Sequence, residues 1–274
     1  MTRTDAAAQY NPMGTTALVT GASSGLGPGY AHELARRGAD LVLTARRLDR
    51  LEALAVDLAE KYGTVSTVIP LDLAAAGSAA ELVHDLADRD IRVSTLINNA
   101  GFGRSGSVVD APADVVRGQV AVNVVALTEL TQAFLPDLLS AALTHPHGAA
   151  LVNVASTAAF QPVPQLAVYA ATKAYVLSLT EALWYETRGT GLKVTAVCPG
   201  PTETEFQAVA GNASRGPRRL MTVDEVMTTT FAALDRQAPP PHIVSGTSNR
   251  VVAWLAGSAP RRTVVRVTGR LSRR

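Results

Sequence analysis

The sequence predicts a single α/β domain built on a doubly wound parallel sheet with helices on both faces. Short apolar runs of strand type alternate along the chain with longer stretches of helical periodicity. A glycine-rich turn joins the first apolar run to the first helical stretch, which is typical of such sheets. With 274 residues, of which 47% are hydrophobic, the chain can bury the core that this fold requires.

The first strand, turn and helix form one half of a Rossmann unit. Thr16–Thr20 is an apolar run, a G-x-x-x-G-x-G turn begins at Gly21, and a helical pattern then continues to Gly38. Glycines permit a tight turn, and the helix N-terminus offers partial positive charge to a pyrophosphate. Pro28 suits the first helical turn because its missing N–H costs little there. We therefore expect a dinucleotide site, although the glycine spacing is not G-x-G-x-x-G.

The remaining elements alternate in the same way. Strands are predicted at Leu41–Thr44, Val65–Pro70, Val93–Asn98, Ala149–Ala155, Lys193–Val197 and His242–Ser245. Helices are predicted at Leu48–Tyr62, Ser78–Arg89, Ala113–Leu143, Leu166–Arg188 and Val223–Gln237. This alternation favours a parallel sheet, in which ligands gather at the carboxyl ends of the strands.

A Tyr-x-x-x-Lys pair, Tyr169 and Lys173, is conspicuous because the chain has only three lysines. Residues four apart lie on one face of a helix, so the phenol and the ammonium should be neighbours. A nearby cation favours the phenolate, lowers the pKa of the phenol from near 10 and makes it a better acid–base group. On the pair alone, a surface lysine beside a packed tyrosine is an equal alternative.

Several motifs together carry a family resemblance. They are Thr20-Gly21-x-x-x-Gly25-x-Gly27, Asn98-Asn99-Ala100-Gly101, Ser156, Tyr169-x-x-x-Lys173 and Pro199-Gly200. Their order and spacing resemble the short-chain dehydrogenase/reductase family over roughly residues 14 to 246. Asn123 also matches the family in its distance from Asn99. A protein that keeps the fold without the chemistry is the alternative, and the intact Asn-Ser-Tyr-Lys set argues against it.

The resemblance implies four catalytic residues. Tyr169 would be the general acid in reduction and the general base in oxidation, and Lys173 would lower its pKa and bind the nicotinamide ribose. Ser156 would donate a hydrogen bond to the substrate oxygen, with a strand-end cap as the alternative. Asn123 would hold a water that links Lys173 to solvent. From the residues alone, Asn123 indicates a helix distortion or a buried hydrogen bond.

The end of the second strand indicates the cofactor. Arg46 and Arg47 stand where NAD-type folds place an acid, and Asp49 comes later. A guanidinium suits the 2′-phosphate, so we expect NADP(H) rather than NAD(H). By resemblance, Asp72 and Leu73 would flank the adenine. The expected cofactor-binding residues are Gly21, Ser23, Ser24, Gly25, Leu26, Gly27, Arg46, Asp72, Leu73, Asn99, Ala100, Gly101, Tyr169, Lys173, Pro199, Gly200, Thr202 and Thr204.

The sequence divides into a leader (1–14), a Rossmann domain (15–246) and a basic C-terminal extension (247–274). The leader has no apolar core of a secretory signal, and no apolar stretch approaches the length of a membrane span. The single cysteine, Cys198, excludes an internal disulfide and a multi-cysteine metal site. The histidines show no metal-ligand pattern. We therefore expect a cytoplasmic protein without a metal.

The extension has no acidic residue, and residues 250–274 hold seven arginines. It could form a basic amphipathic helix, split by Pro260, that docks on an anionic membrane or on a partner. We favour the alternative, in which the helix packs on its own subunit with a solvated arginine face. Binding to nucleic acid is not expected, because no aromatic platform accompanies the charge.

Together these features predict an NADP(H)-dependent oxidoreductase that interconverts an alcohol and a ketone or aldehyde. The alternative is a dinucleotide-binding sensor or scaffold protein without turnover. A flexible loop at Ala210–Arg219 stands where the family carries its substrate lid. The expected apolar wall of a hydrophobic substrate site consists of Phe160, Val163, Phe206 and Val209.

Two long helical stretches also predict self-association. Ala113–Leu143 and Leu166–Arg188 carry apolar residues on more than one face, including Leu179, Leu183 and Trp184. One face of each helix must cover the sheet, so the surplus suggests a two-fold helix-pair interface. The family commonly builds dimers and tetramers on these helices, and we expect a homodimer or homotetramer.

Overall fold

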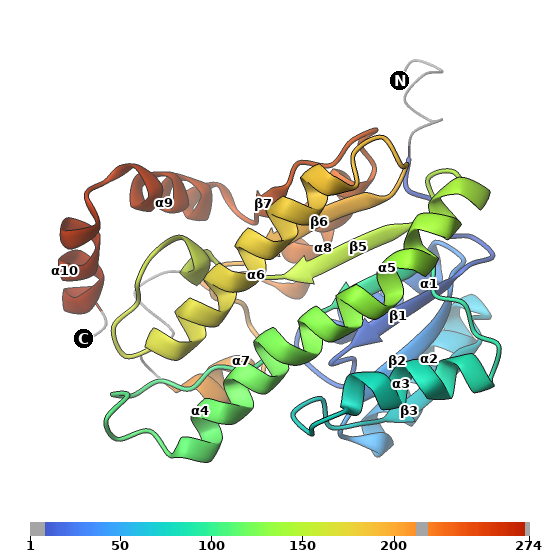
Figure 1. The fold of residues 1–274 in the computed structure, drawn as a ribbon, viewed down its shortest axis with the longest axis horizontal. Helices are drawn as coiled ribbons and strands as arrows, with labels where there is room; N and C mark the ends of the chain where they lie inside the picture. Colours follow the sequence, from blue (N-terminus) through green and yellow to red (C-terminus); the bar gives the residue numbers. More distant parts are fainter. Residues whose placement is uncertain (1–8, 212–218, 272–274) are drawn as a thin grey trace.

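The predicted fold class is confirmed by a computed structural model that describes residues 9–211 and 219–271. Within these residues, one parallel sheet of seven strands has the order β3-β2-β1-β4-β5-β6-β7 (Figure 1). The strands are β1 (Thr16–Thr20), β2 (Asp40–Ala45), β3 (Ser66–Pro70), β4 (Thr95–Asn98), β5 (Ala150–Val154), β6 (Lys193–Cys198) and β7 (His242–Val244). The strand order reverses between β1 and β4, where ligands bind in sheets of this kind.

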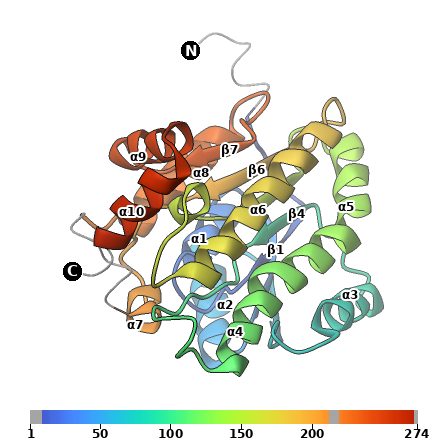
Figure 2. The ribbon, with the colours of Figure 1, turned by 60° about the vertical axis from the view of Figure 1, so that its left-hand side comes forward.

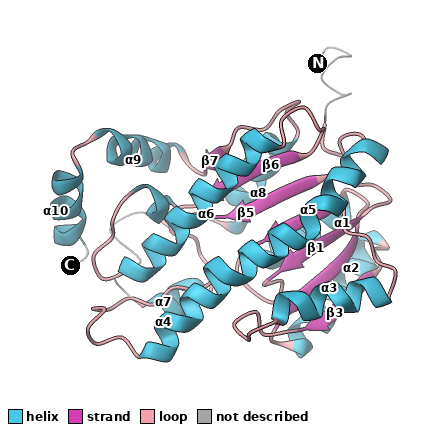
Figure 3. Cartoon of the chain, viewed as in Figure 1, coloured by secondary structure: helices cyan, strands magenta, loops and turns pink. Residues whose placement is uncertain are grey.

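Helices cover both faces of the sheet (Figure 3). One face packs against α1 (Gly27–Arg36), α2 (Leu48–Tyr62) and α8 (Val223–Leu234). The other packs against α3 (Ser78–Asp88), α5 (Leu127–Thr144) and α6 (Ala167–Glu186). Shorter or peripheral elements are α4 (Ala113–Val120), η2 (Ala121–Ala126), η3 (Thr157–Phe160), α7 (Phe206–Ala210), α9 (Thr247–Ser258) and α10 (Arg261–Leu271). The central strands are apolar on both sides, which explains why they read as continuous hydrophobic runs.

The long helix predicted at Ala113–Leu143 is interrupted. Between α4 and α5 the chain makes a π-helical segment, η2, which contains Asn123. The Asn123 side chain is fully buried and hydrogen-bonds the backbone of Phe102 in both directions. π-Helical segments inside helices are frequent at functional sites. Here the distortion occurs at Asn123, whose side chain makes hydrogen bonds with the backbone of the neighbouring loop.

The C-terminal extension forms two helices that separate at Pro260, as the sequence predicts. Ala259 is extended, because the residue before a proline is disfavoured in the helical region. Val264 and Thr268 of α10 are buried, and α9 contacts η3 and β7. These contacts agree with packing on the chain's own subunit. Contact with a membrane, the alternative not favoured from the sequence, is untested, and the boundary at residue 247 stays a prediction.

The three apolar residues of α6 that were expected on an outer face pack against the core instead. Leu183 is buried in the core beside α3 and α5, and Leu179 and Trp184 pack against the same cluster. The indole N–H of Trp184 donates to the carbonyl of Pro239 at 2.8 Å. This expectation about the three residues is wrong, because their side of α6 faces the neighbouring helix and the end of the sheet rather than solvent.

Candidate active site

A cavity of about 940 Å³ opens at the carboxyl edge of the sheet, between the turn after β1 and the start of α6. It brings together almost all the residues that the sequence singled out. Those that line it are Gly21, Ser23, Ser24, Gly25, Leu26, Arg46, Asp72, Leu73, Asn99, Ala100, Gly101, Ser156, Tyr169, Lys173, Pro199, Gly200, Thr202 and Thr204. Gly27 and Asn123 lie behind its surface and support it.

The glycine turn is shaped for close backbone approach. Gly21 and Gly25 both have a φ of +66°, a conformation that other residues rarely adopt. A Cβ atom on Gly27 would lie 2.3 Å from the carbonyl oxygen of Gly21, so only glycine fits where α1 begins. The turn leaves the N-terminus of α1 open toward the cavity, which suits a pyrophosphate.

The turn is tied to the loop after β4. The hydroxyl of Thr20 accepts hydrogen bonds from the backbone N–H groups of Asn99 and Ala100, each at 3.0 Å. The side-chain amide of Asn99 donates to the carbonyl of Thr20 at 2.9 Å. A Cβ atom on Gly21 would lie 2.8 Å from the Cα atom of Ala100. These contacts fix the glycine-turn end of the cavity across the point where the strand order reverses.

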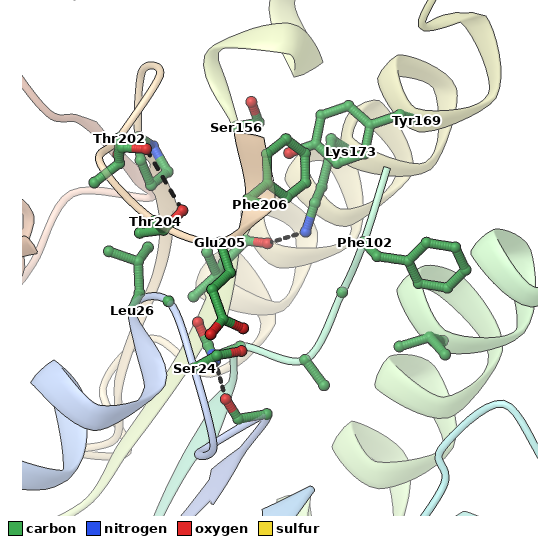
Figure 4. Close-up of a pocket in the computed structure, with 18 of the residues that line it drawn as sticks. Ser24, Leu26, Phe102, Ser156, Tyr169, Lys173, Thr202, Thr204, Glu205 and Phe206 are labelled. Carbon is green, nitrogen blue, oxygen red and sulfur yellow. Dashed lines mark hydrogen bonds between the residues drawn. The ribbon is translucent and has the colours of Figure 1, made fainter. Parts of the chain in front are cut away.

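Arg47 joins this end of the cavity to the segment after β6. Its guanidinium donates to the hydroxyl and carbonyl of Ser23, each at 3.3 Å, and pairs with the Glu205 carboxylate at 2.9 Å. Glu205 also pairs with Arg50, and the two guanidinium groups lower the pKa of its carboxyl. Figure 4 shows the Glu205 side chain among the residues that line the cavity. The sequence analysis pointed to both arginines of the doublet and counted Arg46 among the expected binding residues; both line the cavity.

Tyr169 and Lys173 lie at the opposite end, on the first turns of α6. Both side chains are buried, and the Lys173 Nζ atom donates to the carbonyl of Val154 at 2.6 Å. Burial raises the pKa of Tyr169 to about 12, while a hydrogen bond with Ser156 opposes that increase. Burial also lowers the pKa of Lys173 to about 8.

The expectation that Lys173 lowers the pKa of Tyr169 is therefore not met in this structure. The ammonium lies 5.9 Å from the centroid of the phenol ring and makes its hydrogen bond to β5 instead. Desolvation of the phenolate is the larger effect. The phenol is consequently protonated at neutral pH, which is the form that donates a proton.

Ser156 has both of the roles considered from the sequence. Its hydroxyl accepts a hydrogen bond from the N–H of Ala158 at 3.1 Å and so caps η3 at the end of β5. It also lines the cavity and hydrogen-bonds Tyr169. A hydroxyl can accept one bond and donate another, so the cap leaves the proton of Ser156 available to the site.

Asn123 supports the site from below the cavity floor. Besides its two bonds to Phe102, its amide donates to the hydroxyl of Thr172 on α6 at 3.0 Å. A Cβ atom on Gly101 would lie 3.0 Å from the Asn123 Oδ1 atom and 3.3 Å from the Lys173 Nζ atom. Gly101 therefore separates the amide from the ammonium, and any larger residue there would push them apart.

The Tyr169 end of the cavity also has apolar lining residues. Val163 and Phe206 line it as expected, and the Phe206 ring packs 5.2 Å from that of Tyr169 (Figure 4). Phe160 does not line it, because the short helix η3 turns its ring against His242. Residues 212–218 of the expected lid and the side chain of Val209 lie outside the described residues.

Two positions that the sequence analysis passed over also shape this end. Gly103 lies against Tyr169, since a Cβ atom there would be 2.8 Å from the Cδ2 atom of the phenol ring. Asn249 of α9 fills the space beside Gly200, where a Cβ atom would be 2.2 Å from its Nδ2 atom. The amide of Asn249 donates to the carbonyl of Ser245 at 2.9 Å. Each contact joins distant parts of the chain, so no local pattern in the sequence reveals it.

Comparison with known proteins identifies the family. The family model for short chain dehydrogenases matches residues 15–214. The chain belongs to the short-chain dehydrogenase/reductase family. A sulfoacetaldehyde reductase from Chromohalobacter salexigens is 36% identical over 236 residues, which cover 82% of this chain and 89% of that protein.

Two solved structures are similar over most of their length. A short-chain dehydrogenase from Sphingobium yanoikuyae in complex with NADPH is 35% identical, has a TM-score of 0.77, and matches over 88% of this chain and 91% of that one. The bulky-bulky ketone specific alcohol dehydrogenase from Comamonas testosteroni is 30% identical, has a TM-score of 0.71, and matches over 90% and 95%.

Searches of the described residues for two other features were negative. No described helix has the length and apolar character needed to cross a membrane. Among the same residues, no group of histidine, cysteine, aspartate or glutamate side chains is arranged to hold a metal ion.

The arginine doublet yields a prediction about cofactor preference. Replacing Arg46 or Arg47 by alanine should weaken binding of NADPH about tenfold or more relative to NADH, because only NADPH carries the phosphate that a guanidinium pairs with. The ratio of the two dissociation constants, measured by fluorescence titration, reports this. Arg50→Ala is the matched control, because Arg50 also pairs with Glu205 but does not line the cavity. An unchanged ratio in both variants would remove the doublet from the site.

Proposed function

We propose that the protein is an NADP(H)-dependent oxidoreductase that interconverts an alcohol and a ketone or aldehyde on a hydrophobic substrate. The observation that carries the proposal is the meeting of Tyr169, Ser156 and Lys173 in one cavity with the glycine turn and Arg47. A phenol, a hydroxyl and an ammonium at one end match the needs of a carbonyl that becomes an alcohol. Backbone and guanidinium groups at the other end match a phosphorylated dinucleotide.

The residues divide the chemistry between them. The dinucleotide supplies or accepts the hydride when it is bound. In reduction, the Ser156 hydroxyl orients the carbonyl oxygen and Tyr169 donates the proton that this oxygen takes up. A pKa of about 12 keeps Tyr169 protonated at neutral pH, and a pKa of about 8 keeps most of Lys173 charged. In oxidation, the deprotonated form of Tyr169 accepts the proton of the alcohol hydroxyl.

The cofactor assignment rests on charge at the end of β2. Two arginines border the cavity there, and Arg47 is already held by Ser23 of the glycine turn. The similar dehydrogenase from Sphingobium yanoikuyae was solved with NADPH. NADP(H) is therefore favoured over NAD(H), which has no 2′-phosphate to occupy the guanidinium groups.

The substrate assignment rests on the lining at the Tyr169 end. Phe102, Val163, Leu166 and Phe206 present apolar side chains to it. The alcohol dehydrogenase from Comamonas testosteroni that is specific for bulky ketones is similar in structure. Sulfoacetaldehyde, named for another relative, is anionic and would leave its sulfonate against these apolar groups. An uncharged substrate fits this lining better.

A sensor or scaffold that binds the dinucleotide without turnover is the alternative. The catalytic set argues against it, because Tyr169, Ser156 and Lys173 all line the same cavity. Purified protein that binds NADPH and reduces nothing in a broad panel of ketones and aldehydes would favour the alternative. Location in the cytoplasm, expected from the sequence, stays a prediction.

Loss of the phenol hydroxyl should abolish turnover. Tyr169→Phe removes the proton and keeps the ring, so kcat should fall far more than tenfold while the Kd for NADPH changes little. Lys173→Arg should also be severely impaired. Tyr30→Phe is the control, because it removes a buried hydroxyl from α1, outside the cavity. If Tyr169→Phe keeps more than about a tenth of the wild-type rate, a loss below ~1.4 kcal/mol, Tyr169 is not the general acid.

We also infer a homodimer or homotetramer that uses the outer face of α6. Exposed residues at helical spacing form a stripe of small and aromatic side chains there: Ala171, Tyr175, Ser178, Ala182 and Tyr185. Small residues allow two helices to approach closely, and the Tyr175 hydroxyl is within 2.9 Å of that of Thr128 on α5. A patch shared by two neighbouring helices is suited to an isologous contact.

A charge in this stripe should dissociate the oligomer. Ala182→Arg places a long cation where a second α6 would pack, so light scattering at micromolar concentration should show a shift from oligomer toward monomer. Ala87→Arg makes the same change at an exposed position of α3 and should have no effect. A monomeric wild-type protein would contradict the inference, and so would an Ala182→Arg variant of unchanged mass.

A further inference from the structure

The last helix of the chain reaches the substrate end of the cavity. Thr268 and Leu271 of α10 line it, although both belong to the C-terminal extension, 95 or more residues beyond Lys173 in the sequence. Val264, Thr268 and Leu271 are spaced i, i+4 and i+7, which places them on one face of the helix. Val264 is buried, so this face is the one that α10 turns toward the subunit.

The position of α10 is fixed by the loop that leads into α6. The Thr268 hydroxyl hydrogen-bonds the carbonyl of Pro162 at 3.0 Å. A Cβ atom on Gly269 would lie 3.4 Å from the Cγ atom of Pro164, so the helix lies close against this loop. Figure 2 shows α10 beside this loop. The inner side of the same loop lines the cavity through Gln161 and Val163.

The charges of α10 are kept out of the cavity. Its four described arginines, 261, 262, 266 and 270, are exposed and do not line it. The other described side chains at this end are apolar, hydroxyl or neutral amide groups, apart from the charged Asp114, Lys173 and Glu205. The arginines that do line the cavity lie at the opposite end, on the segment after β2. Lys173 is the one cation among the described lining residues at this end, and its buried ammonium already donates to the carbonyl of Val154.

We infer that α10 is the outer wall of the substrate site, and that Leu271 limits the size of an uncharged, largely apolar ketone. This inference rests on the proposed function, because the reacting carbonyl has to face Tyr169 while the rest of the substrate extends toward α10. Thr268 holds the wall to the loop before α6. Leu271, 47% exposed at the rim, is the side chain whose volume can change without disturbing the core.

The first test measures selectivity between a small and a bulky ketone, butanone and valerophenone. Leu271→Trp narrows the site and should lower kcat/KM for valerophenone about tenfold relative to butanone, because shape discrimination in an apolar pocket is of that order. Leu255→Trp is the matched control. Leu255 is 51% exposed on α9 and does not line the cavity, so the ratio should stay at the wild-type value. A ratio that Leu271→Trp leaves unchanged overturns the inference.

A second test reads binding without turnover. The single native cysteine, Cys198, is buried, so Leu271→Cys introduces the one exposed thiol among the described residues. Saturating valerophenone with NADP⁺ should slow labelling of this thiol about tenfold or more, and should leave Leu255→Cys unaffected. Equal labelling of Leu271→Cys with and without the ketone overturns the inference.

The two readouts separate failure of the wall from failure of the proposed function. If wild-type protein reduces neither ketone but valerophenone protects Leu271→Cys, the wall stands and the proposed catalysis falls. If both ketones are reduced, Leu271→Trp leaves the kcat/KM ratio unchanged and valerophenone does not protect Leu271→Cys, the proposed catalysis is supported and the role of α10 as a wall is overturned. Efficient reduction of sulfoacetaldehyde, with neither ketone reduced nor protective, would overturn the inference in favour of a small anionic substrate.

Discussion

The hydrogen bond from the Lys173 ammonium to the Val154 carbonyl is the contact on which the site depends. A lysine that is only 4% exposed must find a partner, and the end of β5 supplies it. The bond holds the first turns of α6 over the sheet edge, which sets Tyr169 beside Ser156. It also keeps the ammonium within the cavity lining rather than in solvent. The buried charge is thus also a constraint on helix placement.

Much of the fold follows from apolar periodicity. The predicted bounds of β1 and α2 agree with the structure, because a buried strand or an amphipathic helix is specified by its own residues. The segment η2 could not be predicted in the same way. Its position depends on Asn123 finding the backbone of Phe102, which is a tertiary contact. A polar residue in an apolar helical pattern predicts a distortion without giving its form.

The candidate site shows the same division. Motif spacing was sufficient to predict that the glycine turn, Ser156 and Tyr169 lie in one cavity. The direction of the Tyr169 pKa was not predictable, because it depends on how deeply the phenol is buried and on where the neighbouring ammonium points. The pairing of Arg47 with Glu205 and the place of Leu271 in the cavity were not predicted for a related reason. Their roles come from elements that meet only in the folded chain.

The contact between Gly200 and Asn249 has a consequence for how such sequences can vary. The turn after β6 and the helix α9 occupy one shared volume, since a Cβ atom at position 200 would overlap the Asn249 amide. The two positions are therefore coupled: a side chain at 200 is tolerated only when 249 becomes smaller. An exchange of the C-terminal extension therefore has to keep positions 200 and 249 compatible. Chimeras that transplant it have to carry the matching turn with them.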